Sequence, residues 1–69
     1  MELKPDSYRS EIEGLRLEAR PEWLAGRYWW RVFLNGHSKV LLRHREHSIR
    51  VGEILADDEV LLRREQRQT

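Results

Sequence analysis

The sequence predicts an all-β domain, a small five-stranded meander or barrel, and three observations lead to this prediction. Apolar runs recur at roughly ten-residue spacing along the 69 residues. Several of these runs alternate apolar with charged residues, which is typical of half-buried strands. Turn-forming residues lie between the runs, and Asn35-Gly36 is the strongest of these signals.

Closure into a barrel is expected because an open sheet of this size leaves long, unpaired edges. The expected barrel has the size of the SH3-like, Sm-like or OB-like barrels. The runner-up is an α+β arrangement that carries an N-terminal helix, because Tyr8, Ile12, Leu15 and Ala19 also fall at helical spacing.

The first part of the chain is predicted to be an arm followed by a strand. Residues 1–10 contain several turn-forming residues and few apolar ones, so they are assigned to an N-terminal arm. Residues 11–20 are predicted to form the first strand, because LRLEAR (15–20) alternates strictly; a helix over 8–19 is the alternative. Pro21 is expected to end this strand.

The aromatic run RYWWRVFL, residues 27–34, is predicted to be the second strand. Because neighbouring residues of a strand point to opposite faces, two adjacent tryptophans cannot share one core. We expect the core face to carry Trp30, Val32 and Leu34. The opposite face then carries Trp29, Arg31 and Phe33. Asn35-Gly36 is expected to turn the chain into a hairpin.

Three further strands are predicted after this hairpin turn, over 38–45, 48–55 and 59–64. Gly52 interrupts the alternation of the run 48–55, which indicates a β-bulge. Residues 65–69 have nothing to bury and are expected to form a mobile tail. Residues 11–64 would then form a single small domain.

Composition excludes several classes of protein. The chain has no cysteine, so neither disulfides nor thiolate metal sites are available. The net charge of +1 gives no general attraction to a polyanion. No apolar run approaches the roughly 20 residues of a membrane span, and the N-terminus is too polar for a signal peptide. A cytoplasmic protein with no membrane partner is expected.

The sequence lacks the groupings that catalysis and metal binding require. His44 and His47 would point to opposite faces of a strand, and with His37 they supply no converging set of ligands. No nucleophile elbow, phosphate-binding glycine loop or zincin motif is present. We therefore expect no enzyme, no cofactor, no metal and no small-molecule substrate.

Aromatic and arginine side chains would gather on the outer side of the predicted hairpin, and such residues are enriched at protein interfaces. The candidate binding surface consists of Trp29, Arg31, Phe33, Lys39, Leu41, Arg43, Arg45 and Arg50. The predicted function is a small binding domain, of regulator or inhibitor type, that contacts a protein partner or a second copy of itself. The alternative is a small β-barrel that binds RNA or single-stranded nucleic acid through Trp29, Arg31, Arg43, Arg45 and Arg50.

Overall fold

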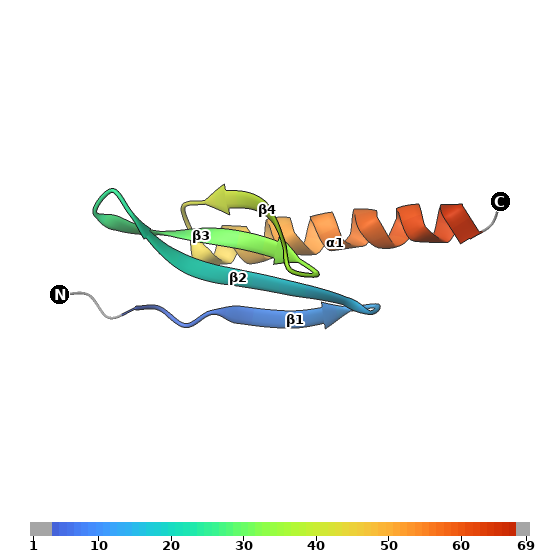
Figure 1. Cartoon of the computed structure of the whole chain (residues 1–69), viewed down its shortest axis with the longest axis horizontal. Helices are drawn as coiled ribbons and strands as arrows, with labels where there is room; N and C mark the ends of the chain where they lie inside the picture. The colour runs from blue at the N-terminus through green and yellow to red at the C-terminus, as the bar shows by residue number, and fades with distance from the viewer. Residues whose placement is uncertain (1–3, 68–69) are drawn as a thin grey trace.

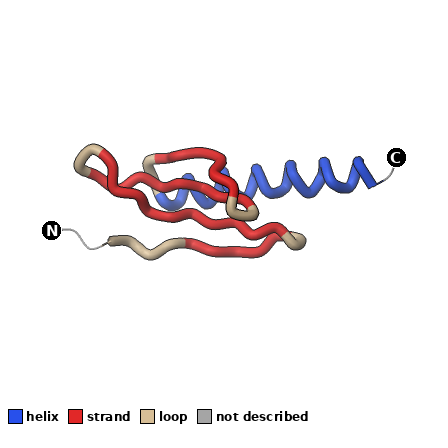
Figure 2. The backbone as a smooth tube through the Cα atoms, in the orientation of Figure 1, coloured by secondary structure: helices blue, strands red, loops and turns tan. Residues whose placement is uncertain are grey.

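The computed structural model describes residues 4–67, which form four antiparallel strands and one helix (Figures 1 and 2). The elements, in chain order, are β1 (Tyr8–Ile12), β2 (Leu15–Leu24), β3 (Arg27–Leu34), β4 (His37–Leu42) and α1 (Arg45–Arg67). The strands follow one another across an open sheet in the order β1-β2-β3-β4. Helix α1 packs on one face of the sheet and extends beyond it, so the molecule measures 53 × 18 × 18 Å.

All three hairpins turn on two residues with positive φ, which is the pattern of type I′ turns. The φ angles are 47° and 84° at Glu13-Gly14, 50° and 79° at Ala25-Gly26, and 49° and 81° at Asn35-Gly36. The predicted turn at Asn35-Gly36 is therefore confirmed. The Glu13-Gly14 turn was missed because Glu rarely occupies this backbone region. Gly26 was expected to turn the chain within a connection over 21–26, but β2 runs on to Leu24 and Ala25-Gly26 alone form the turn.

The core lies between the sheet and α1. Strand β2 buries Leu15, Leu17 and Ala19, and the helix contributes Ser48, Gly52 and Ala56. The prediction that β3 faces the core with Trp30, Val32 and Leu34 is confirmed, since at most 5% of each residue is exposed.

The three buried helix residues are small and lie four positions apart, so they bring the helix axis close to the sheet. A Cβ atom added at Gly52 would lie 2.6 Å from Cδ1 of Leu17 and 3.2 Å from Cγ1 of Val32. The buried hydroxyl of Ser48 is satisfied, because its Oγ donates a hydrogen bond to the carbonyl of His44 at 2.7 Å.

The predicted all-β five-stranded barrel is wrong, because the chain forms an open four-stranded sheet with a C-terminal helix. The runs 48–55 and 59–64 belong to the single helix α1, and Gly52 is a site of close packing rather than a β-bulge. The α+β runner-up named the correct class but placed its helix at the wrong end. Helix α1 covers one face of the sheet, and β1 and β4 are its two edge strands.

Several strand boundaries also differ from the prediction. The predicted strand 11–20 is divided by the Glu13-Gly14 turn, and β1 begins at Tyr8, inside the predicted arm. Pro21 lies within β2 rather than ending it. It is tolerated there because the last β1–β2 pair is Tyr8 with Ala19, so β2 is an edge strand at this point.

The predicted strand 38–45 ends at Leu42 in β4, and Arg45 already begins α1. Residues 65–67 of the predicted mobile tail are helical, while 68–69 lie outside the described residues, as do residues 1–3 of the predicted arm. Helix α1 thus takes in Arg45 of the predicted strand 38–45 and residues 65–67 of the predicted tail.

Candidate interaction surface on the open sheet face

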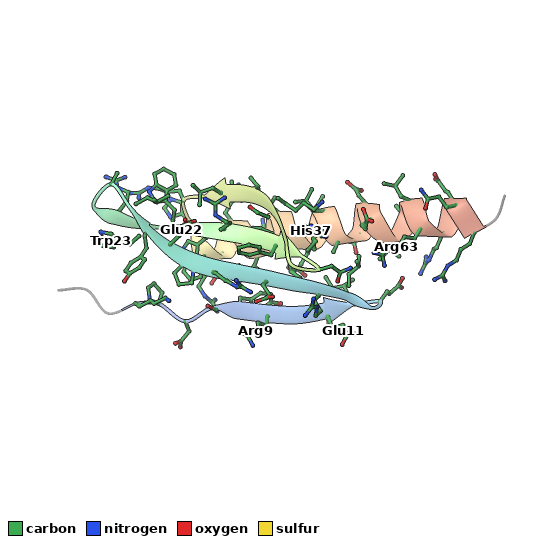
Figure 3. All side chains as sticks on the ribbon, viewed as in Figure 1. Arg9, Glu11, Glu22, Trp23, His37 and Arg63 are labelled. Atoms are coloured by element: carbon green, nitrogen blue, oxygen red, sulfur yellow. The ribbon has the colours of Figure 1, made fainter. Side chains whose placement is uncertain are left out.

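The face of the sheet opposite α1 is not covered by another element of the described chain (Figures 1 and 3). Strand alternation and register place thirteen side chains on it, and we call this surface the open face. Its members are Arg9, Glu11, Arg16, Glu18, Arg20, Glu22, Leu24, Arg27, Trp29, Arg31, Phe33, Ser38 and Leu41. Aromatic rings and arginines therefore lie beside glutamates on one continuous surface.

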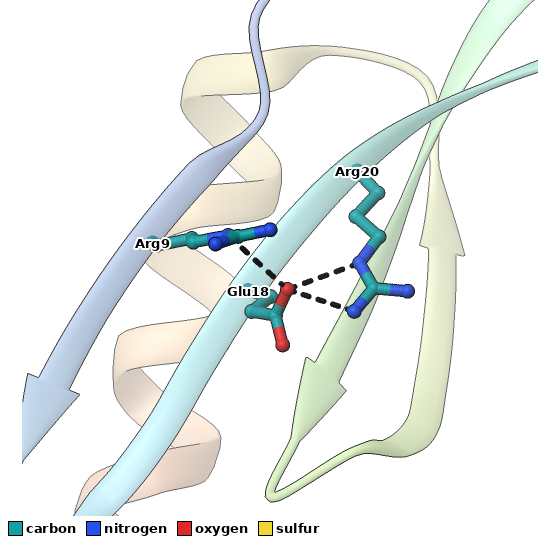
Figure 4. A network of polar contacts seen from close by, with 3 residues as sticks. All are labelled: Arg9, Glu18 and Arg20. Atoms are coloured by element: carbon teal, nitrogen blue, oxygen red, sulfur yellow. Dashed lines mark hydrogen bonds and ion pairs between the residues drawn. The ribbon is translucent and has the colours of Figure 1, made fainter.

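Two glutamates neutralise the arginines at the centre of the open face. Glu18 Oε2 accepts hydrogen bonds from Nε and Nη2 of Arg20 at 3.0 and 2.8 Å (Figure 4). The same oxygen lies 3.6 Å from Nε of Arg9. Arg31 Nε donates to Glu22 Oε2 at 2.6 Å. The Glu18 side chain, which joins Arg9 on β1 to Arg20 on β2, is only 13% exposed, so its carboxylate is largely buried.

Two half-buried aromatic rings on β3 are each covered by an arginine. The Arg20 guanidinium carbon lies 4.5 Å from the centre of the Phe33 ring, and that of Arg43 lies 5.5 Å from the Trp29 ring. Trp29 Nε1 also donates a hydrogen bond to the carbonyl of Leu24 at 3.2 Å. Cation–π contacts at exposed sites contribute about 0.5–1 kcal/mol each. These contacts hold both rings in defined orientations.

A small hollow of about 170 Å³ lies between the two polar pairs of β2 and β3. Its walls are Arg20, Pro21, Glu22, Arg31 and Phe33. The aromatic ring gives the hollow an apolar wall, while the carboxylate and guanidinium groups supply hydrogen-bonding atoms. Its volume is well below the roughly 300 Å³ at which small-molecule pockets begin. It suits a single inserted side chain better than a substrate.

The structure divides the eight residues of the predicted surface between different parts of the molecule. Trp29, Arg31, Phe33 and Leu41 lie together on the open face. Arg43 follows β4 and reaches this face through its contact with Trp29. Lys39 is exposed in β4, at the shift of register between β3 and β4.

Arg45 and Arg50 do not belong to the open face. The Arg45 guanidinium lies 5.9 Å from the Tyr8 ring and 5.7 Å from the Trp30 ring, on the core side of the sheet. Its Nε also donates to the Asp6 carbonyl at 3.4 Å. Arg50 lies on α1. Arg45 was misplaced because the predicted strand 38–45 ends at Leu42 and Arg45 begins α1, and Arg50 was misplaced because the predicted strand 48–55 is helical.

Sequence reasoning missed Arg9, Arg20, Glu18 and Glu22, which make up the polar centre of the open face. Glu18 and Arg20 lie within the alternation that predicted a strand, so their position on the outer side was available from the sequence. Their contact with β3 could not be predicted from the sequence, because the register of β2 against β3 depends on the Ala25-Gly26 turn.

The described residues offer no group of three His, Cys, Asp or Glu side chains arranged to hold a metal ion. Within the same part of the chain, no helix is both long enough and apolar enough to cross a membrane. The helix α1 carries charged residues along most of its length.

Comparison of this chain with protein-family models, with curated proteins and with solved structures finds no match. The chemistry of the open face is therefore the basis on which a function is proposed.

Proposed function

We propose that this chain is a non-enzymatic binding domain, of regulator or inhibitor type, whose open face contacts a protein partner. One observation carries the proposal: an uncovered sheet face displays the half-buried rings of Trp29 and Phe33, each held in place by an arginine. Trp and Arg are the residues that contribute most often to binding energy at the centre of protein interfaces.

The charge pairing on the open face favours a protein partner over a phosphate backbone. Arg9 and Arg20 already share the carboxylate of Glu18, and Arg31 is bound to Glu22. A phosphate that approached these arginines would have to displace the glutamate carboxylates or would be repelled by their negative charge. A protein surface instead packs on the rings and on the aliphatic parts of the paired side chains.

Site-specific photocrosslinking in the producing cell tests this proposal. A photoreactive residue at Phe33 should trap a partner protein, whereas the same residue at Glu53, which is exposed on α1, should not. Binding of the purified partner is then compared between the parent chain and Trp29→Ala. Loss of an anchoring ring should weaken binding about 30-fold or more, as for a hot-spot residue.

Trp23→Ala is the matched control, because Trp23 is 53% exposed at the β2–β3 hairpin end and is not a member of the open face. Helix content and thermal unfolding of each variant show whether it remains folded. Equal crosslinking at positions 33 and 53, or equal affinity of the Trp29→Ala and parent chains for the partner, would show that the open face is not the binding surface.

The second candidate function is binding of single-stranded nucleic acid. It is favoured by Arg16, Lys39 and Arg43, which are exposed and make no ion pair within the described part of the chain. Titration with a mixed oligonucleotide, followed by tryptophan fluorescence, tests it. Binding should weaken steeply as salt rises, because phosphate contacts release counterions. Absence of a response at low salt eliminates this candidate.

A further inference from the structure

The open face carries a second hollow beside the one between β2 and β3. It has a volume of about 450 Å³, and we call it the basic hollow. Its walls are Arg9, Ser10, Arg16, Leu17, Glu18 and Arg20. Arg20 is also a wall of the 170 Å³ hollow that contains Phe33, which we call the aromatic hollow. The two hollows therefore adjoin at Arg20.

The basic hollow has more positive than negative charge. Three guanidinium groups and one carboxylate line it, which leaves an excess of two positive charges. Glu11 is the neighbour of Arg16 across the β1–β2 pair, but it is not a wall of the hollow and makes no ion pair with Arg16 in the described part of the chain. With Glu11 counted, an excess of one positive charge remains.

The guanidinium groups of the basic hollow still have hydrogen-bond donors to offer. Glu18 Oε2 accepts from Nε and Nη2 of Arg20 and faces Nε of Arg9, so Nη1 of Arg20 and both Nη atoms of Arg9 have no partner among the described residues (Figure 4). A guanidinium group can only donate, so these atoms require an acceptor. The excess positive charge favours a carboxylate, which binds a guanidinium through two parallel hydrogen bonds.

The walls of the basic hollow remain open to solvent. The Arg9 and Arg20 side chains are 78% and 48% exposed. Sites for small molecules bury about 70–90% of the ligand surface, and so open a hollow cannot do this. It is suited instead to a side chain that a larger surface presents to it.

The aromatic hollow places an apolar contact next to the basic one. The rings of Pro21 and Phe33 are among its walls, and the Arg20 guanidinium holds the Phe33 ring from 4.5 Å. Its other two charged walls, Glu22 and Arg31, are paired with each other at 2.6 Å. An apolar side chain can therefore enter this hollow without leaving an unpaired charge.

We propose that the partner binds the open face with a segment in which an acidic side chain neighbours an apolar one. The carboxylate enters the basic hollow, and the apolar side chain enters the aromatic hollow against Phe33. This inference rests on the proposed function and deepens it by naming the chemistry of the partner.

A nucleic acid does not match this arrangement. It carries a phosphate at every nucleotide, so it would bring negative charge to Glu11 and Glu22 as well as to the basic hollow. A protein can place one carboxylate at the point of excess positive charge and an apolar group beside it.

Short peptides test the chemistry directly. The isotope-labelled full chain is titrated at low salt with acetylated, amidated Glu-Glu-Leu-Glu-Glu and followed by NMR. This peptide should bind at least about threefold more tightly than Gln-Gln-Leu-Gln-Gln and than Glu-Glu-Ser-Glu-Glu, and more weakly as salt rises. The shifted signals should come from residues 9–20 and from Phe33. Absence of binding, or equal binding of the Glu and Gln peptides, overturns the proposal.

Paired variants locate the binding site. Arg9→Gln with Arg16→Gln should weaken binding of Glu-Glu-Leu-Glu-Glu at least about threefold, while Arg20 stays in place to hold Phe33 and Glu18. Arg50→Gln with Arg67→Gln is the matched control, because it removes the same charge from exposed positions on α1. Equal loss in both double variants would show a general effect of net charge and refute the basic hollow as the site.

The partner trapped by crosslinking at position 33 provides the closing test. Its affinity should fall at least about threefold in the Arg9→Gln, Arg16→Gln variant. Unchanged affinity in this variant, together with weaker binding by Trp29→Ala, overturns the acidic chemistry and leaves the proposed function standing. Failure to trap any partner refutes the proposed function, and the peptide titration then decides the chemistry of the hollows by itself. Tighter binding of a mixed oligonucleotide than of Glu-Glu-Leu-Glu-Glu also overturns the proposal.

Discussion

Replacing Gly52 with alanine should destabilise the protein, although alanine is the better helix former. Gly52 is buried in α1, where the helix comes closest to β2 and β3. A new Cβ atom would lie 2.6 Å from Leu17 Cδ1 and 3.2 Å from Val32 Cγ1. Carbon atoms that are not bonded pack at about 3.5–4 Å, so the helix or the leucine must move.

The size of the effect follows from two opposing contributions. Forcing an extra methyl group into a packed core costs about 1–3 kcal/mol. The higher helix propensity of alanine returns about 1 kcal/mol. Leu17 and Val32 are fully buried, so neither side chain has free space into which it can turn. We expect a net loss of about 1 kcal/mol, which lowers the melting temperature by roughly 4–8 °C.

Urea unfolding followed by the circular dichroism of α1 measures this loss. The same substitution should cost less in a Leu17→Val background, because valine lacks the Cδ1 atom that the new methyl group meets. If Gly52→Ala instead raises the free energy of unfolding by about 1 kcal/mol, helix propensity alone decides the outcome. The close approach of α1 to the sheet would then not depend on this glycine.

Two turn substitutions should change stability in opposite directions, and thermal unfolding measures both. Ala25→Asn should stabilise the folded protein by about 0.5–1 kcal/mol, because Ala25 has a φ angle of 50° and asparagine tolerates this backbone region better. Ala25→Val is the control and should destabilise the folded protein. Asn35→Gly should cost about 0.5–1.5 kcal/mol, because it retains the turn but removes the Oδ1 atom that accepts the Arg16 N–H at 2.9 Å. An unchanged melting temperature for both Ala25→Asn and Asn35→Gly would contradict these assignments.

The aromatic hairpin was predictable from the sequence because its signals are local. Asn35-Gly36 tolerates the two positive φ angles of a type I′ turn, and this turn begins the pairing of β3 with β4. Alternation along 27–34 then separates Trp30 from Trp29, which the structure places on opposite faces of the sheet. The outward position of Trp29, Arg31 and Phe33 follows from the same alternation.

The C-terminal helix was not predictable in this way, and two related segments show why. Residues 40–43 and 60–63 have the same sequence, Val-Leu-Leu-Arg, yet the first lies at the end of β4 and the second within α1. A short apolar run is compatible with either structure when its periodicity is read alone. Residues 40–42 pair with β3 because a two-residue turn joins them to it, whereas 60–63 continue a helix that packs on the completed sheet.

The Asn35-Gly36 hairpin and the two faces of the aromatic strand follow from local signals, since turn chemistry and the two-residue period of a strand act between near neighbours. The helical position of Gly52 and the position of Arg45 near the Tyr8 and Trp30 rings depend instead on contacts between distant parts of the chain. The reason is that a helix over 45–67 gains its stability by burying small residues against Leu17 and Val32, which are distant in the chain. That contact, and the open face it leaves on the other side of the sheet, exist only once the strands have paired.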